Sequence, residues 1–224
     1  MHGQVAVREL LRKVRIHGLK RSLRFASGEI RYLIAGRLLK GSYSQRGEDL
    51  LSDRLLGGKV AGYYVDVGAN DPVRYNNTMR FYRRGWSGIN IEPDPDSFVR
   101  LERTRPRDLN LNIGIGLEDR KMPFFRFFPQ SYSTFSEPEA ERNRRCGFAL
   151  VETIDLPVRR LDEVLDEYRG DKPIDLISVD TEGFDLYVLR SNDWGRFRPT
   201  VVVIDRSLRV NPAQGPVLPI RTRN

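Results

Sequence analysis

The sequence predicts an α/β fold built on a doubly wound parallel sheet. From about residue 43, short apolar runs alternate with segments of helical periodicity, as they do in parallel α/β proteins. Four of the apolar runs end in an acidic residue, and such sheets bind ligands at the carboxyl ends of their strands. The length of 224 residues fits one domain of ordinary size with a small extension.

Nine segments account for the predicted sheet and its helices. The expected strands are 63–67, 87–91, 109–113, 174–179 and 200–204. The expected helices are 77–84, 95–104, 161–168 and 184–190. Asp94 is the expected N-cap of the second helix, Pro95 fits its first turn, and Gly85 fits the end of the first helix.

Two further strand-like stretches, 122–128 and 148–158, are expected to form a hairpin-like excursion with no helix between them. Six aromatic side chains gather in this part of the chain. They are Phe124, Phe125, Phe127, Phe128, Tyr132 and Phe135. We interpret them as ordinary sheet packing, with a wall on which a sugar stacks as the alternative.

Residues 1–42 are predicted to be a basic, amphipathic helical arm, followed by a domain at 43–205 and an irregular tail at 206–224. Residues 1–40 hold ten basic and two acidic side chains, so they account for the whole formal net charge of +8. This concentration argues against nucleic acid as a partner of the domain. The arm is expected either to pack on its own domain or to dock on an anionic membrane surface.

Composition excludes several kinds of catalytic site from the domain. The only histidines are His2 and His17, and the only cysteine is Cys146. The domain therefore lacks a Ser-His-Asp triad, a Cys-His pair and a histidine-ligated metal site. The sequence also has no apolar run long enough to span a membrane and no convincing secretory signal. We expect a cytoplasmic protein, with peripheral contact to a membrane as the alternative.

The acids that end the strands predict a ligand site at the C-terminal edge of the sheet. They are Asp66, Glu92, Asp180 and Asp205. Gly68 allows a tight turn after the first strand, but the next glycines of a pyrophosphate-binding G-x-G-x-x-G loop are missing. Glu92, 24 residues beyond Gly68, is placed to hold a ribose diol. Adenosine without a diphosphate fits this pattern, which favours S-adenosylmethionine over NAD.

Five ordered sequence blocks resemble the FkbM-type methyltransferases. They are S-Q-R-G-E-D from Ser44, V-D-V-G-A-N-D from Val65, N-N-T from Asn76, G-W-S-G-I-N-I-E-P from Gly85 and I-D-L-I-S-V-D-T-E-G-F-D from Ile174. The resemblance covers about residues 43–205. It implies a class I, Rossmann-like fold that uses S-adenosylmethionine, commonly for O-methylation of saccharides or natural products.

The resemblance also implies that six residues bind the cofactor. Among them, Glu92 would bind the ribose and Asn112 would lie near the adenine. The six are Asp66, Gly68, Ala69, Asn70, Glu92 and Asn112. The chain departs from the family pattern at two positions. Asp71 stands where many members carry a small or apolar residue, and Asp205 replaces a common glutamate.

Asp180 and Glu182 occupy the D-x-E-G block of the family and are the predicted catalytic residues. Because the domain lacks histidine, a carboxylate is the natural base for a hydroxyl acceptor. Asp180 is our first choice and Glu182 our second. The alternative for Glu182 is an acid in the first turn of a helix, stabilised by the helix dipole. Nothing in the spacing demands a metal ion.

Three classes of function compete on the sequence alone. A methyltransferase acting on a small-molecule or glycan acceptor is favoured. An NAD-dependent oxidoreductase is disfavoured by the missing glycines and by the absence of a convincing Tyr-x-x-x-Lys pair. A non-catalytic binding or membrane-docking module is the third.

The C-terminal sequence supports the third class. Only 19 residues follow Asp205, fewer than the final helix and antiparallel strand pair of a class I methyltransferase need. Pro212, Pro216 and Pro219 disfavour regular structure there. We therefore expect a shortened sheet with its last strand as an exposed edge, weak or absent activity, and low solubility or a dimer contact along that strand. Coverage of the edge by the N-terminal arm is the alternative.

Overall fold

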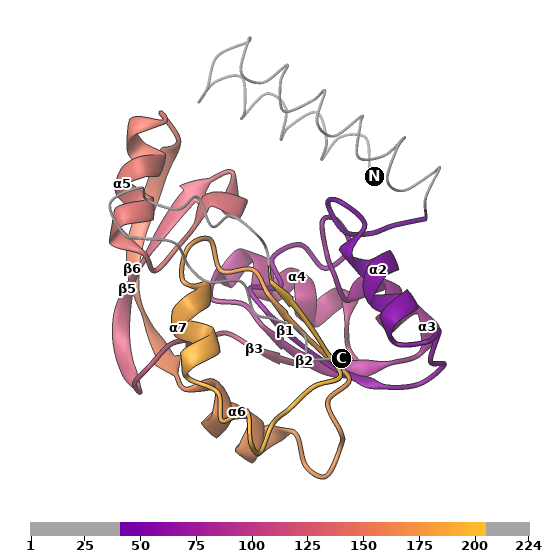
Figure 1. Cartoon of the computed structure of the whole chain (residues 1–224). Helices are drawn as coiled ribbons and strands as arrows, with labels where there is room; N and C mark the ends of the chain where they lie inside the picture. The colour runs from indigo at the N-terminus through magenta and orange to yellow at the C-terminus, as the bar shows by residue number, and fades with distance from the viewer. Residues whose placement is uncertain (1–40, 205–224) are drawn as a thin grey trace, which may run out of the picture.

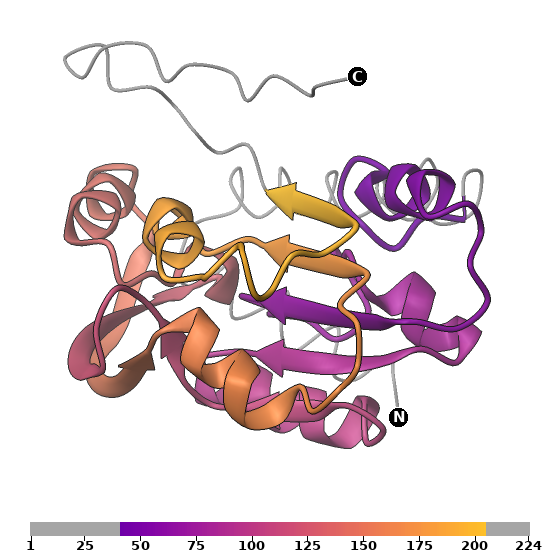
Figure 2. The same cartoon turned by 60° about the horizontal axis from the view of Figure 1, so that its bottom comes forward.

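The structure, a computed structural model, describes residues 41–204. Its centre is a parallel sheet in the order β3-β2-β1-β7-β8 (Figures 1 and 2). The strands are β1 (Tyr63–Val67), β2 (Ser87–Ile91), β3 (Leu109–Leu111), β7 (Leu176–Val179) and β8 (Val201–Ile204). The winding reverses between β1 and β7, which confirms the predicted doubly wound sheet.

Apolar clusters cover both faces of this sheet, because successive side chains of a strand point to opposite sides. Val65 and Val67 of β1 pack in one cluster with side chains of α6 (Leu161–Tyr168) and α7 (Asp185–Arg190). Tyr64, the residue before Val65, faces the other cluster with side chains of α3 (Met79–Arg84). All five residues of β1 are buried, as a central strand requires.

The helix α4 (Pro95–Thr104) has the predicted bounds and the predicted N-cap. One carboxylate oxygen of Asp94 accepts hydrogen bonds from the backbone N–H groups of Asp96 and Ser97, each at 3.0 Å. The helix α3 begins two residues later than predicted. The side-chain oxygen of Asn76 accepts from the N–H groups of Thr78 and Met79, at 3.0 and 2.8 Å, and so satisfies the first donors of the helix.

A second, smaller sheet in the order β4-β6-β5 contains the expected excursion. Its strands are β4 (Gly114–Ile115), β5 (Arg120–Phe128) and β6 (Ala149–Arg159), and β5 pairs antiparallel with β6. The prediction that no helix lies between the two long strands is wrong. A 3-10 turn, η2 (Gln130–Tyr132), and the helix α5 (Glu137–Arg145) connect them (Figure 1).

The composition of α5 explains why apolar periodicity missed it. Ala140 is its only buried apolar side chain, so the helix has no apolar face to detect. Its ends carry other signals: Ser136 caps the N-terminus, the first turn is acidic and the last turn is basic. Sheet packing is confirmed for Phe124 and Phe135 of the aromatic cluster, which pack against Val158 of β6. Phe127 and Phe128 are also buried.

A fully buried cation, Arg105, ties the end of α4 to the loop that follows β1. Its guanidinium donates to the carbonyl oxygen of Pro72 from two nitrogens, at 2.7 and 3.1 Å, and to the side-chain oxygen of Asn76 at 2.6 Å. It also donates to the hydroxyl of Thr78 at 2.9 Å and lies 3.8 Å from a carboxylate oxygen of Asp108. A buried charge is tolerated because it is paired and hydrogen-bonded in this way.

Several predictions from the sequence fall outside the described residues. These are the basic arm apart from Gly41 and Ser42, the acid Asp205, and the tail at 206–224 with the exposed edge and shortened sheet inferred from it. The membrane-docking alternative rests on the same arm. Among residues 41–204, no helix is long and apolar enough to cross a membrane.

We predict that Arg105→Ala costs about 3–5 kcal/mol of unfolding free energy, because it removes the hydrogen bonds to the buried oxygens and the cation beside the Asp108 carboxylate. Urea denaturation of the full chain measures this loss. Arg103→Ala, at an exposed position in the last turn of α4, is the control and should cost about 0.5 kcal/mol or less. Equal losses in the two variants would contradict the role given to Arg105.

Candidate functional site

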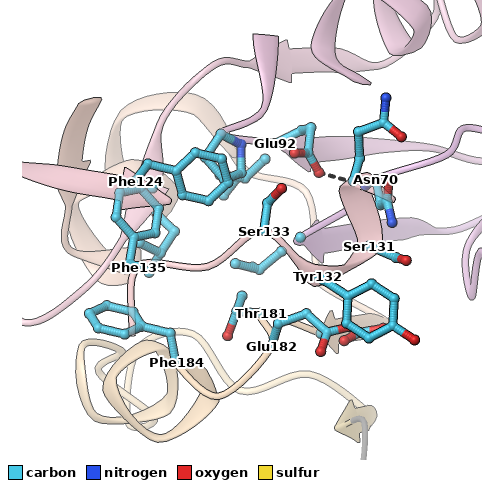
Figure 3. Close-up of a pocket in the computed structure, with 18 of the residues that line it drawn as sticks. Asn70, Glu92, Phe124, Ser131, Tyr132, Ser133, Phe135, Thr181, Glu182 and Phe184 are labelled. Carbon is cyan, nitrogen blue, oxygen red and sulfur yellow. Dashed lines mark hydrogen bonds between the residues drawn. The ribbon is translucent and has the colours of Figure 1, made fainter. Parts of the chain in front are cut away.

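A cavity of about 360 Å³ opens at the C-terminal edge of the parallel sheet, where the winding reverses. Its lining includes Val67 and Gly68 from the end of β1, Glu92 after β2 and Asp180 after β7. The segment between β5 and α5 supplies another wall (Figure 3). The ligand site predicted from the strand-terminal acids therefore has a cavity at the expected edge.

Gly68 brings the ends of β1 and β7 into close contact. Its φ is 82°, and its N–H donates to the carbonyl oxygen of Ile91 at 2.9 Å. A Cβ atom at this position would lie 1.9 Å from the carbonyl oxygen of Asp180. Only glycine fits both the backbone conformation and the space, so the predicted tight turn is present.

Three residues other than glycine have a positive φ in residues 41–204: Asn70 at 48°, Tyr75 at 54° and Glu182 at 50°. All three line the cavity. Left-handed backbone is unfavourable for most side chains with a Cβ, although asparagine tolerates it, and such residues cluster at functional sites. The coincidence marks this cavity as the candidate functional site.

Glu92 is buried at the edge of the cavity. Its Oε2 accepts from the N–H of Asn70 at 2.6 Å (Figure 3), and its Oε1 accepts from the N–H of Asp94 at 2.7 Å. Burial raises the pKa of Glu92 to about 8, although the two backbone hydrogen bonds lower it. A carboxylate oxygen accepts more than one hydrogen bond, so the group keeps capacity for a ligand.

Asp66 does not line the cavity but lies behind it, on the α3 side of the sheet. Its Oδ2 accepts from the hydroxyl of Thr78 at 2.7 Å and from the amide of Asn76 at 3.4 Å. Burial raises the pKa of Asp66. The structure thus gives Asp66 a part in the network around Arg105, and its predicted contact with a cofactor stays a prediction.

Ala69 and Asn112 also stand behind the lining. The carbonyl oxygen of Ala69 accepts from the amide of Asn76 at 3.0 Å. The amide of Asn112 donates to the carbonyl oxygens of Glu92 and Pro93, at 2.8 and 2.9 Å. Both residues therefore support backbone next to the cavity, and their predicted contacts with a cofactor are not tested by this placement.

Both predicted catalytic carboxylates, Asp180 and Glu182, line the cavity. The hydroxyl of Thr134 donates to the carbonyl oxygen of Glu182 at 2.9 Å, which ties the loop after β7 to the β5–β6 excursion. The interpretation of Glu182 as an acid in the first turn of a helix is wrong. The helix α7 begins three residues later, and its first-turn acid is Asp185.

Two parts of the lining lie outside the site residues predicted from the sequence, although a sugar-stacking wall was the alternative given for the aromatic cluster. The first is the wall from the excursion, with Phe124, Phe135 and the stretch Gln130–Tyr132. The second is the segment before β1, with Gln45 and Glu48. The aromatic cluster was a signal for the first, and the S-Q-R-G-E-D block was a signal for the second.

We predict that Gly68→Ala destabilises the fold by several kcal/mol more than Gly85→Ala. Both glycines have a positive φ, but a Cβ at Gly85 meets nothing within 4 Å, whereas one at Gly68 collides with backbone. Gly85→Ala therefore measures the conformational cost, about 1 kcal/mol. Denaturant unfolding measures the loss of unfolding free energy in each variant. The difference between the two losses is the contribution of the close approach between β1 and β7. Similar losses at the two positions would show that the approach is not needed.

The comparisons with known proteins agree with this geometry. The family model described as the methyltransferase FkbM domain matches residues 66–218, beginning at the acid of β1. No significant match to a curated protein or to a solved structure was found. The matched range covers more than half of the chain. The resemblance that the five sequence blocks suggest is therefore confirmed, and the chain belongs to the FkbM methyltransferase family.

Proposed function

We propose that the protein transfers a methyl group from S-adenosylmethionine to a hydroxyl of a saccharide or a related metabolite. The observation that carries this proposal is the buried carboxylate of Glu92, held by two backbone N–H groups at the edge of the cavity. A ribose diol donates hydrogen bonds to such a carboxylate. The glycine-poor turn after β1 suits a nucleoside without a pyrophosphate.

The residues present fit this cofactor. Glu92 would hold the ribose, and the backbone at Gly68 and Asn70 would pass beside the ligand. The side chains of Val67, Ile91 and Ile113 give the lining an apolar part on which an adenosyl group can pack. When bound, S-adenosylmethionine supplies a methyl group on a positively charged sulfur.

The protein's own contribution to the reaction is to hold the two reactants at attack distance and to accept a proton. Positioning alone supplies about 7–11 kcal/mol of the barrier in favourable cases. Asp180 follows β7 and lines the cavity, with its backbone beside Gly68. This position supports its carboxylate as the base that takes the proton of an acceptor hydroxyl. Glu182, tied to the excursion through Thr134, is the second candidate base.

The excursion supports a hydroxyl-rich acceptor. Gln130, Ser131 and Ser133 are polar residues of the lining, which also includes Phe124 and Phe135. In Figure 3, Ser133 lies between the two rings on one side and Ser131 on the other. Sugars combine hydroxyl groups with apolar ring faces, and this combination of side chains matches both. The aromatic residues thus serve sheet packing and contribute to the cavity at once.

We predict that the affinity for S-adenosylmethionine rises with pH between about 6 and 8.5. Glu92 has a pKa of about 8 and is mainly protonated below that pH. Hydrogen bonds from a ribose favour the ionised form, so binding releases a proton and becomes tighter as the pH rises. Calorimetry in two buffers of different ionisation enthalpy measures the affinity and the proton release.

Glu92→Gln is the matched control for this pH dependence. The variant should bind about 1.5–3 kcal/mol more weakly, as expected for lost hydrogen bonds to a charged group, and its affinity should not follow pH. A wild-type affinity that is constant over this range, or a variant that binds equally well, would remove Glu92 from the cofactor site.

We predict that Asp180→Asn lowers turnover about 100-fold or more and changes cofactor affinity little, because a general base contributes to the chemical step. Turnover is measured as S-adenosylhomocysteine formed with a panel of saccharides, and affinity by calorimetry. Glu182→Gln, measured in parallel, separates the two candidate bases. Full turnover in Asp180→Asn would assign the base elsewhere.

A further inference from the structure

We propose that Glu48, in the segment before β1, binds the α-ammonium group of S-adenosylmethionine. The inference rests on the proposed function and adds the residue that holds the end of the cofactor opposite the ribose. Glu48 lines the same cavity as Glu92 but comes from the start of α2 (Glu48–Leu55).

A buried carboxylate fixes the segment that carries Glu48. Asp49 accepts hydrogen bonds from the hydroxyls of Ser42 and Ser44, at 2.5 and 2.8 Å, and from the N–H of Tyr43 at 2.7 Å. All four residues are buried. The segment is therefore an ordered part of the domain, and it presents Glu48 from a defined backbone.

Contacts with the sheet place this segment on one side of the cavity. The N–H of Asn76 donates to the carbonyl oxygen of Tyr43 at 3.0 Å, so the segment lies against the loop after β1. The helix α2 packs near β8, at the opposite end of the sheet from β3. Figures 1 and 2 show α2 and the β5–β6 excursion on opposite sides of the molecule.

The strand order gives the direction of the cofactor. Glu92 follows β2, so a ribose held there lies on the β2 side of Gly68. The methionyl part must then extend past the end of β1 toward β7 and β8. Glu48 lies on that side, because its helix packs near β8.

An α-ammonium needs an anionic partner, and the cavity offers four carboxylates from the described residues: Glu48, Glu92, Asp180 and Glu182. Glu92 is placed at the ribose and Asp180 at the acceptor hydroxyl. Glu182 is tied to the excursion side, because its carbonyl oxygen accepts from the hydroxyl of Thr134. Asp66, the acid within β1, does not line the cavity and is engaged by Thr78 and Asn76.

The charge of the lining favours a cationic group at this position. None of the described lining residues is lysine, arginine or histidine. The Oε2 of Glu48 accepts from the backbone N–H of Arg46 at 2.8 Å. Within the described lining, no cationic side chain competes with a ligand ammonium for this carboxylate. An amino group that donates to a carboxylate gains a charge-assisted hydrogen bond, which is stronger than a neutral one.

The test compares three ligands by calorimetry with the full chain and its Glu48→Gln variant. S-adenosylhomocysteine carries the ammonium and the carboxylate, its decarboxylated form keeps the ammonium without the carboxylate, and 5′-methylthioadenosine has neither. The sulfur is an uncharged thioether in all three ligands, so the series isolates the ammonium. Glu48→Gln should weaken the first two about 10- to 100-fold and leave methylthioadenosine within about twofold. Glu92→Gln, the matched control, should weaken all three because it acts on the ribose.

The outcomes separate this inference from the proposed function. If the wild type binds none of the three ligands, the proposed function fails. If it binds them and Glu48→Gln weakens none, or weakens all equally while its circular dichroism spectrum stays that of the wild type, the role of Glu48 fails and the function stands. If Asp180→Asn, and not Glu48→Gln, weakens binding of only the two ligands that carry an amino group, the ammonium is held by Asp180.

Binding of methylthioadenosine also reports whether the variant is folded. Should Glu48→Gln lose it, Glu48→Asp replaces that variant, since it keeps the carboxylate and an acidic residue in the first turn of α2. It should show a smaller loss that is still confined to the two amino ligands. A loss of equal size for methylthioadenosine would overturn the inference.

Discussion

The guanidinium of Arg105 donates hydrogen bonds to Pro72, Asn76 and Thr78, three residues of the loop that joins β1 to α3. The hydroxyl of Thr78 in turn donates a hydrogen bond to the carboxylate of Asp66 in β1. The cavity side of the same loop carries residues in left-handed backbone, which need a surrounding structure that holds them. One buried cation behind the sheet thus fixes the loop that forms part of the cavity in front of it.

Much of the central sheet could be predicted because its elements carry strong local signals. The apolar runs of β1 and β2 and the cap and proline of α4 gave the bounds that the structure has. The helix α5 could not be found in this way, since its stability depends on its ends and on charge instead of an apolar face. Arg105 gave no signal either, because nothing in the sequence distinguishes a buried arginine from an exposed one.

The candidate site was predictable to the extent that it follows from strand ends. Gly68, Asn70, Glu92, Asp180 and Glu182 all line one cavity, as expected for residues at the carboxyl edge of a parallel sheet. Asp66 was placed there by its position late in β1, but alternation along the strand turns its side chain toward α3. The walls from the excursion and from the segment before β1 depend on long-range packing, which local patterns do not contain.

The central claim is that S-adenosylmethionine binds in the cavity where the winding of the sheet reverses, between β1 and β7, with its ribose at Glu92. A crystal structure of the full chain with S-adenosylhomocysteine tests it most directly. The account predicts ribose hydroxyls within hydrogen-bond distance, about 2.5–3.0 Å, of the Glu92 carboxylate. It also predicts that the homocysteine part extends toward Glu48. A ligand bound elsewhere, or a ribose that does not contact Glu92, would contradict the account.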